Sequence, residues 1–174
     1  MTERSARAAF AGVDEAATAC DGDALARLNA ALRAGFEVNM KTGGPEQLAA
    51  MASLLRPDNA HLYARILAVE EAPFRPLLTR LIVDGVAAGV FDTFDPEGVA
   101  DMIYGLAART NSNIVEVLQV PEESARERAI DSLTTRFRLH GIAIDRILGL
   151  PDGSVVTLTR AQVESMVAAL PRHY

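Results

Sequence analysis

The chain has 174 residues, 49% of them hydrophobic and 23% charged, with a formal net charge of −6, one cysteine and no tryptophan. This composition is typical of a globular protein, excludes a disulfide scaffold or wholesale disorder, and offers no run of about 20 apolar residues that would cross a membrane. The acidic balance argues against a surface that holds a phosphate backbone. We expect an all-α fold, because good helix formers dominate, and a cytoplasmic location, which a lone Cys20 fits.

Apolar residues three and four positions apart predict the first two helices, over residues 3–20 and 23–40. Asp23 suits the N-cap position of the second helix, because its side chain can accept a free backbone N–H. The sequence Thr-Gly-Gly-Pro at 42–45 predicts a turn, and a short third helix is expected from there to about residue 55.

The next segment predicts a helix that two prolines interrupt. Apolar periodicity supports a helix over about 58–71, which Pro73 and Pro76 follow closely. Because proline lacks an N–H and clashes with the preceding turn, we expect a break or kink there and a restarted helix. Gly89 suits the C-terminal cap of that restarted helix.

Two long helices and a short one are expected in the rest of the chain. The Asp-Pro pair at 95–96 is typical of a helix start and predicts a helix over about 96–119. That helix carries two apolar stripes, so we expect neighbours on two of its sides. A second long helix is expected over about 122–148. Thr159 and Gln162 have the spacing of a capping box, which predicts a last short helix.

The polar residues offer no arrangement that indicates catalysis or metal binding. His61, His140 and His173 are scattered and lack ligand partners at the right spacing. No serine lies in a Gly-x-Ser-x-Gly setting, and no glycine-rich loop leads into Lys-Ser/Thr. The basic residues of 126–138 alternate with acids, which is typical of a solvated helix face. We expect no catalytic residue, no metal and no cofactor, and we interpret Cys20 as a buried, inert thiol.

Aromatic and medium-polar residues on different helices are the candidates for a small-molecule cavity. Methionines, aromatic rings and an isolated amide are typical of such cavities, and equally of an ordinary helical core. Core packing is therefore the default interpretation of each residue taken singly. The candidates for ligand binding are Phe36, Met51, Tyr63, Phe74, Tyr104 and Asn111.

Two stretches resemble the C-terminal effector-binding domain of the tetracycline-repressor (TetR) family. In the first, 74–106, a helix ends in Gly-x-x-x-Gly-x-Phe and a short turn leads to Asp-Pro at the start of a long helix. The second, 144–154, reads Ile-Asp-Arg-Ile-Leu-Gly-Leu-Pro-Asp-Gly-Ser and is similar to the end of the last long helix in many members. The resemblance covers nearly all of residues 1–174, which we treat as a single domain.

The resemblance implies an all-α homodimer with a small-molecule effector. The long helices, about 96–119 and 122–148, would pack against the same pair of a second copy as a four-helix bundle. The interface residues expected on these helices are Val99, Ile103, Leu106, Ile114, Ile130, Leu133, Phe137 and Ile144. A hydrophobic effector would bind among the earlier helices, at the six candidate residues named above.

The chain departs from the family in one large respect. Family members begin with a helix-turn-helix unit that reads DNA, and no segment here resembles it. The chain would then contact DNA only through a unit that it does not contain, whether by truncation or by true loss. The predicted function is the ligand-sensing and dimerisation domain of a TetR-like transcriptional regulator. The alternatives are a stand-alone small-molecule-binding or sequestering helical dimer without DNA binding, and an enzyme of unrecognised type.

Overall fold

The computed structural model describes residues 3–41, 57–118 and 123–168, and this part of the chain is helical and contains no strand. In chain order the elements are α1 (Glu3–Thr18), α2 (Ala24–Lys41), a 3-10 turn η1 (Pro57–Asn59), α4 (Ala60–Ala87), α5 (Pro96–Leu118), α6 (Glu123–Ile147) and α7 (Arg160–Ala168). The all-α prediction is confirmed for these residues. The third helix predicted up to about residue 55 lies outside the described residues.

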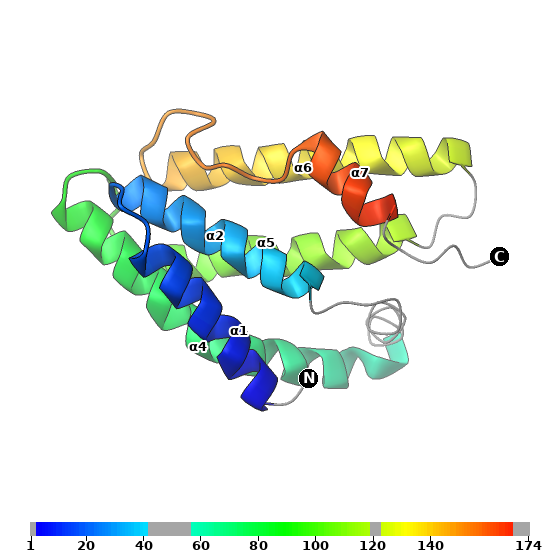
Figure 1. Ribbon diagram of the computed structural model, residues 1–174, viewed down its shortest axis with the longest axis horizontal. Coiled ribbons are helices and arrows are strands. Elements are labelled where there is room, and N and C mark those ends of the chain that lie inside the picture. Colours follow the sequence, from blue (N-terminus) through cyan, green and yellow to red (C-terminus); the bar gives the residue numbers. More distant parts are fainter. Residues whose placement is uncertain (1–2, 42–56, 119–122, 169–174) are drawn as a thin grey trace.

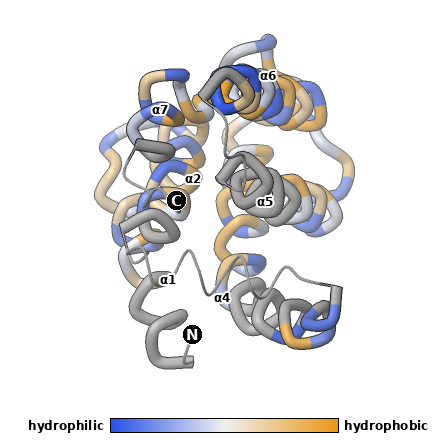
Figure 2. The backbone as a smooth tube through the Cα atoms, turned by 90° about the vertical axis from the view of Figure 1, so that its right-hand side faces the viewer, coloured by the Kyte–Doolittle hydropathy of each residue, from blue (hydrophilic) through white to orange (hydrophobic). Residues whose placement is uncertain are grey.

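The helices form two layers. Figure 2 shows α1, α2 and α7 on one side of the molecule and α4, α5 and α6 on the other. Consecutive long helices run in opposite directions, so one end of the molecule gathers the start of α2, the end of α4, the start of α5 and the end of α6 (Figure 1). We call this end the packed corner. The opposite end holds the end of α2, the start of α4, the end of α5 and the start of α6.

Local capping signals set the helix ends as predicted. A carboxylate oxygen of Asp23 accepts the N–H three residues on at 2.9 Å, and one of Asp95 does the same at 3.0 Å. The side-chain oxygen of Gln162 accepts the N–H of Thr159 at 2.9 Å, and the hydroxyl of Thr159 accepts the N–H of Gln162 at 3.3 Å. The predicted capping box is therefore confirmed.

Of the break or kink predicted at Pro73 and Pro76, the break with a restarted helix is wrong. Both prolines lie inside α4, which continues from Ala60 to Ala87 and changes direction part-way along in Figure 1. Each proline removes one backbone hydrogen bond, and the described packing of the helix begins at the prolines themselves. Phe74, between the prolines, meets Phe10 of α1 edge to face, with ring centroids 5.9 Å apart, and Leu77 is fully buried.

The buried apolar side chains that the structure describes form two clusters. The larger one fills the packed corner, and its most deeply buried large members are Val13, Leu28, Leu77, Ile82, Ile103 and Leu148. The smaller one joins α6 to α7 and consists of Ile130, Leu133, Phe137 and Val163, with Phe36 of α2 packed against it. The whole arrangement thus leaves α2 in contact with both clusters.

Candidate functional site

The Gly-x-x-x-Gly-x-Phe sequence builds the corner between α4 and α5. Phe91 is buried and folds back onto α4, where a Cβ at Gly85 would come within 2.0 Å of its ring. The carbonyl oxygen of Gly85 accepts the N–H groups of Val90 and Phe91, at 2.9 and 3.1 Å, and Gly89 ends the helix at a φ of +68°. Gly85 is therefore required by the close approach of Phe91, and Gly89 is required by its backbone conformation.

The two stretches that carry the family resemblance meet in the structure. The backbone N–H of Asp92 donates to the carbonyl oxygen of Leu148 at 2.9 Å. Gly149 has a φ of +70°, and a Cβ there would lie only 2.8 Å from the Cβ of Asp92. Glycine is thus required both by the backbone conformation and by the close approach of the other stretch.

A buried carboxylate fixes the segment that follows α6. Asp145 is fully buried and accepts the N–H of Gly153 at 2.6 Å and the N–H of Val155 at 2.7 Å. These charge-assisted bonds offset the cost of burying the carboxylate. Sequence reasoning missed this role, although Asp145 stood next to Ile144 in a predicted apolar stripe.

Asn29 ties the same segment to α2. Its side-chain amide donates to the carbonyl oxygen of Ser154 at 3.1 Å and accepts the N–H of Val156 at 2.9 Å. Residues 153–156, which we call the strap, are therefore bound to α6 and to α2 at once. Sequence reasoning missed Asn29 as well, since no local pattern relates it to a segment so far along the chain.

Two of the three described ligand-site candidates lie at the second half of α2. Phe36 meets Phe137 of α6 edge to face, with ring centroids 5.8 Å apart. One residue earlier, a Cβ at Gly35 would lie 3.4 Å from the ring of Phe74 on α4. Tyr104 of α5 is half-buried against the larger cluster, as Phe74 is. Phe74 and Tyr104 thus share one cluster, whereas Phe36 belongs to the other.

The other three candidates lie outside what the structure describes. Met51 is not among the described residues, and the side chains of Tyr63 and Asn111 are not described either. Tyr63 belongs to the first turn of α4 and Asn111 to the second half of α5. Figure 1 places these two helix segments at the end of the molecule away from the packed corner. Their part in a ligand site stays a prediction.

Most residues expected at a dimer interface are buried inside the chain itself. Six of the eight are at most 7% exposed, and they are Val99, Ile103, Ile130, Leu133, Phe137 and Ile144. Leu106 is half-buried against the larger cluster, and the side chain of Ile114 is not described. The pairing of two copies stays a prediction. The six buried side chains pack against other helices of the same chain.

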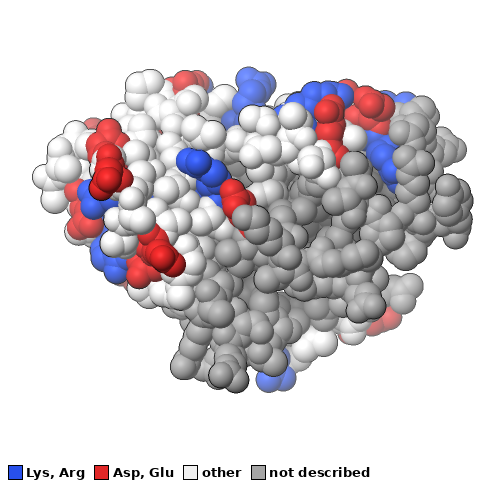
Figure 3. Space-filling model, viewed as in Figure 1, with Lys and Arg blue, Asp and Glu red and all other residues white. Residues whose placement is uncertain are grey.

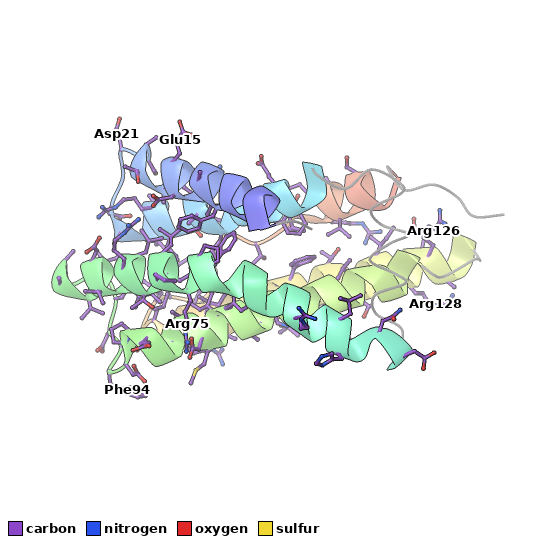
Figure 4. The ribbon with its side chains drawn as sticks, turned by 90° about the horizontal axis from the view of Figure 1, so that it is seen from below. Glu15, Asp21, Arg75, Phe94, Arg126 and Arg128 are labelled. Atoms are coloured by element: carbon purple, nitrogen blue, oxygen red, sulfur yellow. The ribbon has the colours of Figure 1, made fainter. Side chains whose placement is uncertain are left out.

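Other apolar residues of α5 and α6 face outward. Met102 of α5 is 55% exposed and Leu139 of α6 is 50% exposed. Phe94, in the loop before α5, is 97% exposed and points away from the bundle in Figure 4. These side chains, which sequence reasoning did not select as interface residues, are accessible apolar surface on and beside α5 and α6.

Charged side chains connect neighbouring helices at the surface. Arg75 of α4 pairs through two nitrogens with Asp101 of α5, and Arg80 of α4 pairs with Asp14 of α1. Arg75 is labelled in Figure 4. On the face shown in Figure 3, the coloured acidic and basic side chains lie next to one another. This mixture fits the predicted solvated helix faces.

Hydrogen bonding and burial shift several pKa values. The hydrogen bond from Arg146 lowers the pKa of Asp152 and raises that of Arg146, with two contacts of 2.9 and 3.1 Å. Hydrogen bonds to Asp131 and then Glu164 raise the pKa of Arg160. Partial burial, and next the nearby charge of Arg136, lower the pKa of His140.

Comparison with protein-family models, with curated proteins and with solved structures finds no match. Across residues 3–41, 57–118 and 123–168, no three His, Cys, Asp or Glu side chains gather closely enough to hold a metal ion. In the same part of the chain, no helix combines the length and the apolar character needed to cross a membrane. The function must therefore be inferred from the residues and their placement.

Proposed function

We propose that the chain is the ligand-sensing and dimerisation domain of a TetR-like transcriptional regulator, whose DNA-reading unit lies outside this chain. The observation that carries the proposal is the contact between the two resembling stretches, through Asp92, Leu148 and Gly149. Two segments far apart in sequence, both chosen for their likeness to one family, build a single packed corner. This contact supports a resemblance in fold, and the function follows from it by analogy.

A hydrophobic small molecule would bind beside the second half of α2. Two observations support this position: Phe36 of α2 is half-buried against the smaller cluster, and the ring of Phe74 on α4 lies next to Gly35, the residue before it. Tyr104 of α5, half-buried against the larger cluster, remains a further candidate. Rigid aromatic side chains from several helices are typical of apolar ligand sites in bundles. Ligand binding would then shift the spacing of two DNA-reading units in a dimer.

The second copy would pair through the outward faces of α5 and α6. Met102 and Leu139 supply exposed apolar surface on two antiparallel helices that lie side by side. Long antiparallel pairs of this kind associate as four-helix bundles. The buried stripe of α6 would hold each protomer together, and the outward residues would hold the dimer together.

Binding of the dye 1-anilinonaphthalene-8-sulfonate tests the ligand site. The folded chain should bind the dye saturably, and Phe74→Leu should weaken binding by about threefold or more, because it removes a ring from the site. Val83→Ala is the matched control, since Val83 lies on the same helix with its side chain 47% exposed. Absence of saturable binding, or equal effects of the two substitutions, would contradict the proposed site.

A further inference from the structure

The dipeptide Asp-Gly occurs three times in the chain, at 21–22, 84–85 and 152–153. Asp-Gly is prone to spontaneous rearrangement, because glycine has no Cβ to hinder its backbone nitrogen. That nitrogen attacks the side-chain carboxyl carbon of the aspartate, a C–N bond forms, and one water leaves to give a cyclic imide. Water then reopens the imide, and reopening at the main-chain carbonyl carbon gives isoaspartate. The reaction therefore needs a glycine nitrogen that is free to move onto the carboxyl group.

The pair at 84–85 is held inside a helix. Asp84 and Gly85 lie in the last turn of α4, where the N–H of a residue is directed along the helix axis toward the preceding turn. The ring of Phe91 covers Gly85, and an added Cβ there would come within 2.0 Å of it. The carbonyl oxygen of Gly85 also accepts the N–H groups of Val90 and Phe91. Closure of the imide would have to disrupt this packed helix end, so the fold protects the pair.

Both reacting groups of the pair at 152–153 are already engaged. The N–H of Gly153 donates to the buried carboxylate of Asp145 at 2.6 Å. The carboxylate of Asp152 accepts two contacts from Arg146, at 2.9 and 3.1 Å, and this hydrogen bonding lowers the pKa of Asp152. Imide formation expels water more easily from the neutral carboxyl group than from the carboxylate. The pair is therefore protected, although both of its residues lie at the surface.

The pair at 21–22 has neither kind of protection. Asp21 and Gly22 lie between the end of α1 and the start of α2, and both are exposed. Figure 4 shows the side chain of Asp21 pointing away from the helices. Within the described part of the chain, neither the carboxylate of Asp21 nor the N–H of Gly22 has a hydrogen-bond or ion-pair partner. This glycine nitrogen can therefore reach the carboxyl group without breaking a contact.

We propose that Asp21 is the site of spontaneous isoaspartate formation among the three Asp-Gly pairs, and that the fold protects the other two. The reaction releases one water and takes up one water, and it needs no other reactant. Its product lengthens the main chain by one methylene group between α1 and α2. The change lies next to Asp23, whose carboxylate caps α2. The proposal depends neither on the ligand nor on the second copy.

Incubation of the folded chain at physiological temperature and pH, followed by digestion with trypsin, tests the proposal. Cleavage after arginine places the three pairs in separate peptides, 8–27, 81–109 and 147–160. An isoaspartyl peptide keeps its mass and is separated from the aspartyl form by chromatography. Peptide 8–27 should gain the isoaspartyl form at least about fivefold faster than either of the others, because only its pair reacts without local unfolding. Equal rates in the three peptides would overturn the proposal.

Two controls separate the effect of the fold from that of the sequence. In concentrated urea the three peptides should convert at similar rates, because the dipeptide is the same and the fold is absent. Rates as unequal in urea as in the folded chain would contradict protection by the fold. Asp21→Glu is the matched variant, since it keeps the charge at an exposed position. Peptide 8–27 should then stay unmodified although it retains Asp14 and Asp23, and its conversion would overturn the assignment to Asp21.

The protection at 152–153 has a test of its own. Arg146→Ala should raise the rate of isoaspartate formation at Asp152 by about twofold or more, because the carboxyl group loses the guanidinium that holds it ionised and in place. The rate at Asp21 should not change in this variant. An unchanged rate at Asp152 would overturn the protection assigned to this ion pair.

Discussion

Asp145 shows how one residue can hold a long connection in place. A carboxylate can accept several N–H donors at once, and Asp145 uses this capacity on two residues of the strap, Gly153 and Val155. The strap has no helix or sheet partner for these N–H groups. The carboxylate supplies what regular secondary structure would otherwise supply, and for this reason it tolerates complete burial.

Asp145→Asn should lower the free energy of unfolding by about 2–4 kcal/mol, because the amide NH₂ replaces one acceptor and leaves a buried N–H without a partner. Urea unfolding monitored by circular dichroism measures the change. Asp152→Asn is the matched control, because it alters a carboxylate of the same segment whose partner, Arg146, lies at the surface. The control should stay close to the wild type, and a loss as large as that of Asp145→Asn would contradict the assigned role.

His140 should make the stability of the chain depend on pH just below neutrality. Its pKa in the folded chain lies below the ordinary 6.5, because partial burial and the charge of Arg136 disfavour the imidazolium ion. The unfolded chain therefore takes up this proton at a higher pH than the folded chain does. The stability that this difference contributes is fully present above pH 6.5, and it is lost as the pH falls from 6.5 through the lower pKa of the folded chain. His140→Gln should reduce this loss, as seen in urea midpoints between neutral and mildly acidic pH. An unchanged pH profile would show that the shift is absent.

At the scale of the element, helix ends were predictable and helix continuity was not. Asp23, Asp95 and the Thr159–Gln162 pair act through bonds within three positions of the chain, so the sequence alone contains both partners. Phe74, between the two prolines of α4, contacts Phe10 of α1, and no local pattern reveals that partner. The local rule for proline therefore predicted a helix end where the folded chain has none.

The corner between α4 and α5 gives a test of this element-scale account. Gly85→Ala should destabilise the chain by about 1–3 kcal/mol, because a Cβ there would collide with the ring of Phe91. Gly12→Ala in α1 is the control, since a Cβ there would meet nothing within 4 Å. It should raise stability by about 0.4–1 kcal/mol through the entropy of the unfolded chain. Thermal unfolding of both variants measures these changes. Equal shifts of the melting temperature would contradict the packing of Phe91 against Gly85.

At the scale of the whole molecule, a stripe of apolar residues predicts burial but does not identify the surface that buries it. The stripe of α6 that includes Leu133 and Phe137 was predicted correctly as apolar, and the structure packs it within the chain. Sequence periodicity has the same form whether the neighbour is a second copy or another helix of the same chain. The candidate site illustrates the same point, because Phe36 and Phe74 were predicted together and lie in two clusters on either side of α2.

The outward residues of α5 and α6 allow dimerisation to be separated from folding. Met102→Glu combined with Leu139→Glu should give a folded monomer, because both side chains are about half exposed in the single chain. Phe137→Glu should instead unfold it, because burying an unpaired charge in the smaller cluster is costly. Leu62→Glu, on exposed surface of α4, is the control and should remain dimeric. Sedimentation velocity distinguishes these states, and a dimer of unchanged strength in the double variant would contradict the proposed pairing surface.

Native mass spectrometry of the purified chain tests the central proposal most directly, because it reports the number of chains and any small molecule held with them. A ligand-sensing dimerisation domain predicts a complex of two chains that carries an apolar small molecule, either retained from the cell or taken up from added compounds. A single chain at micromolar concentration, with no added mass from any apolar compound offered, would contradict it.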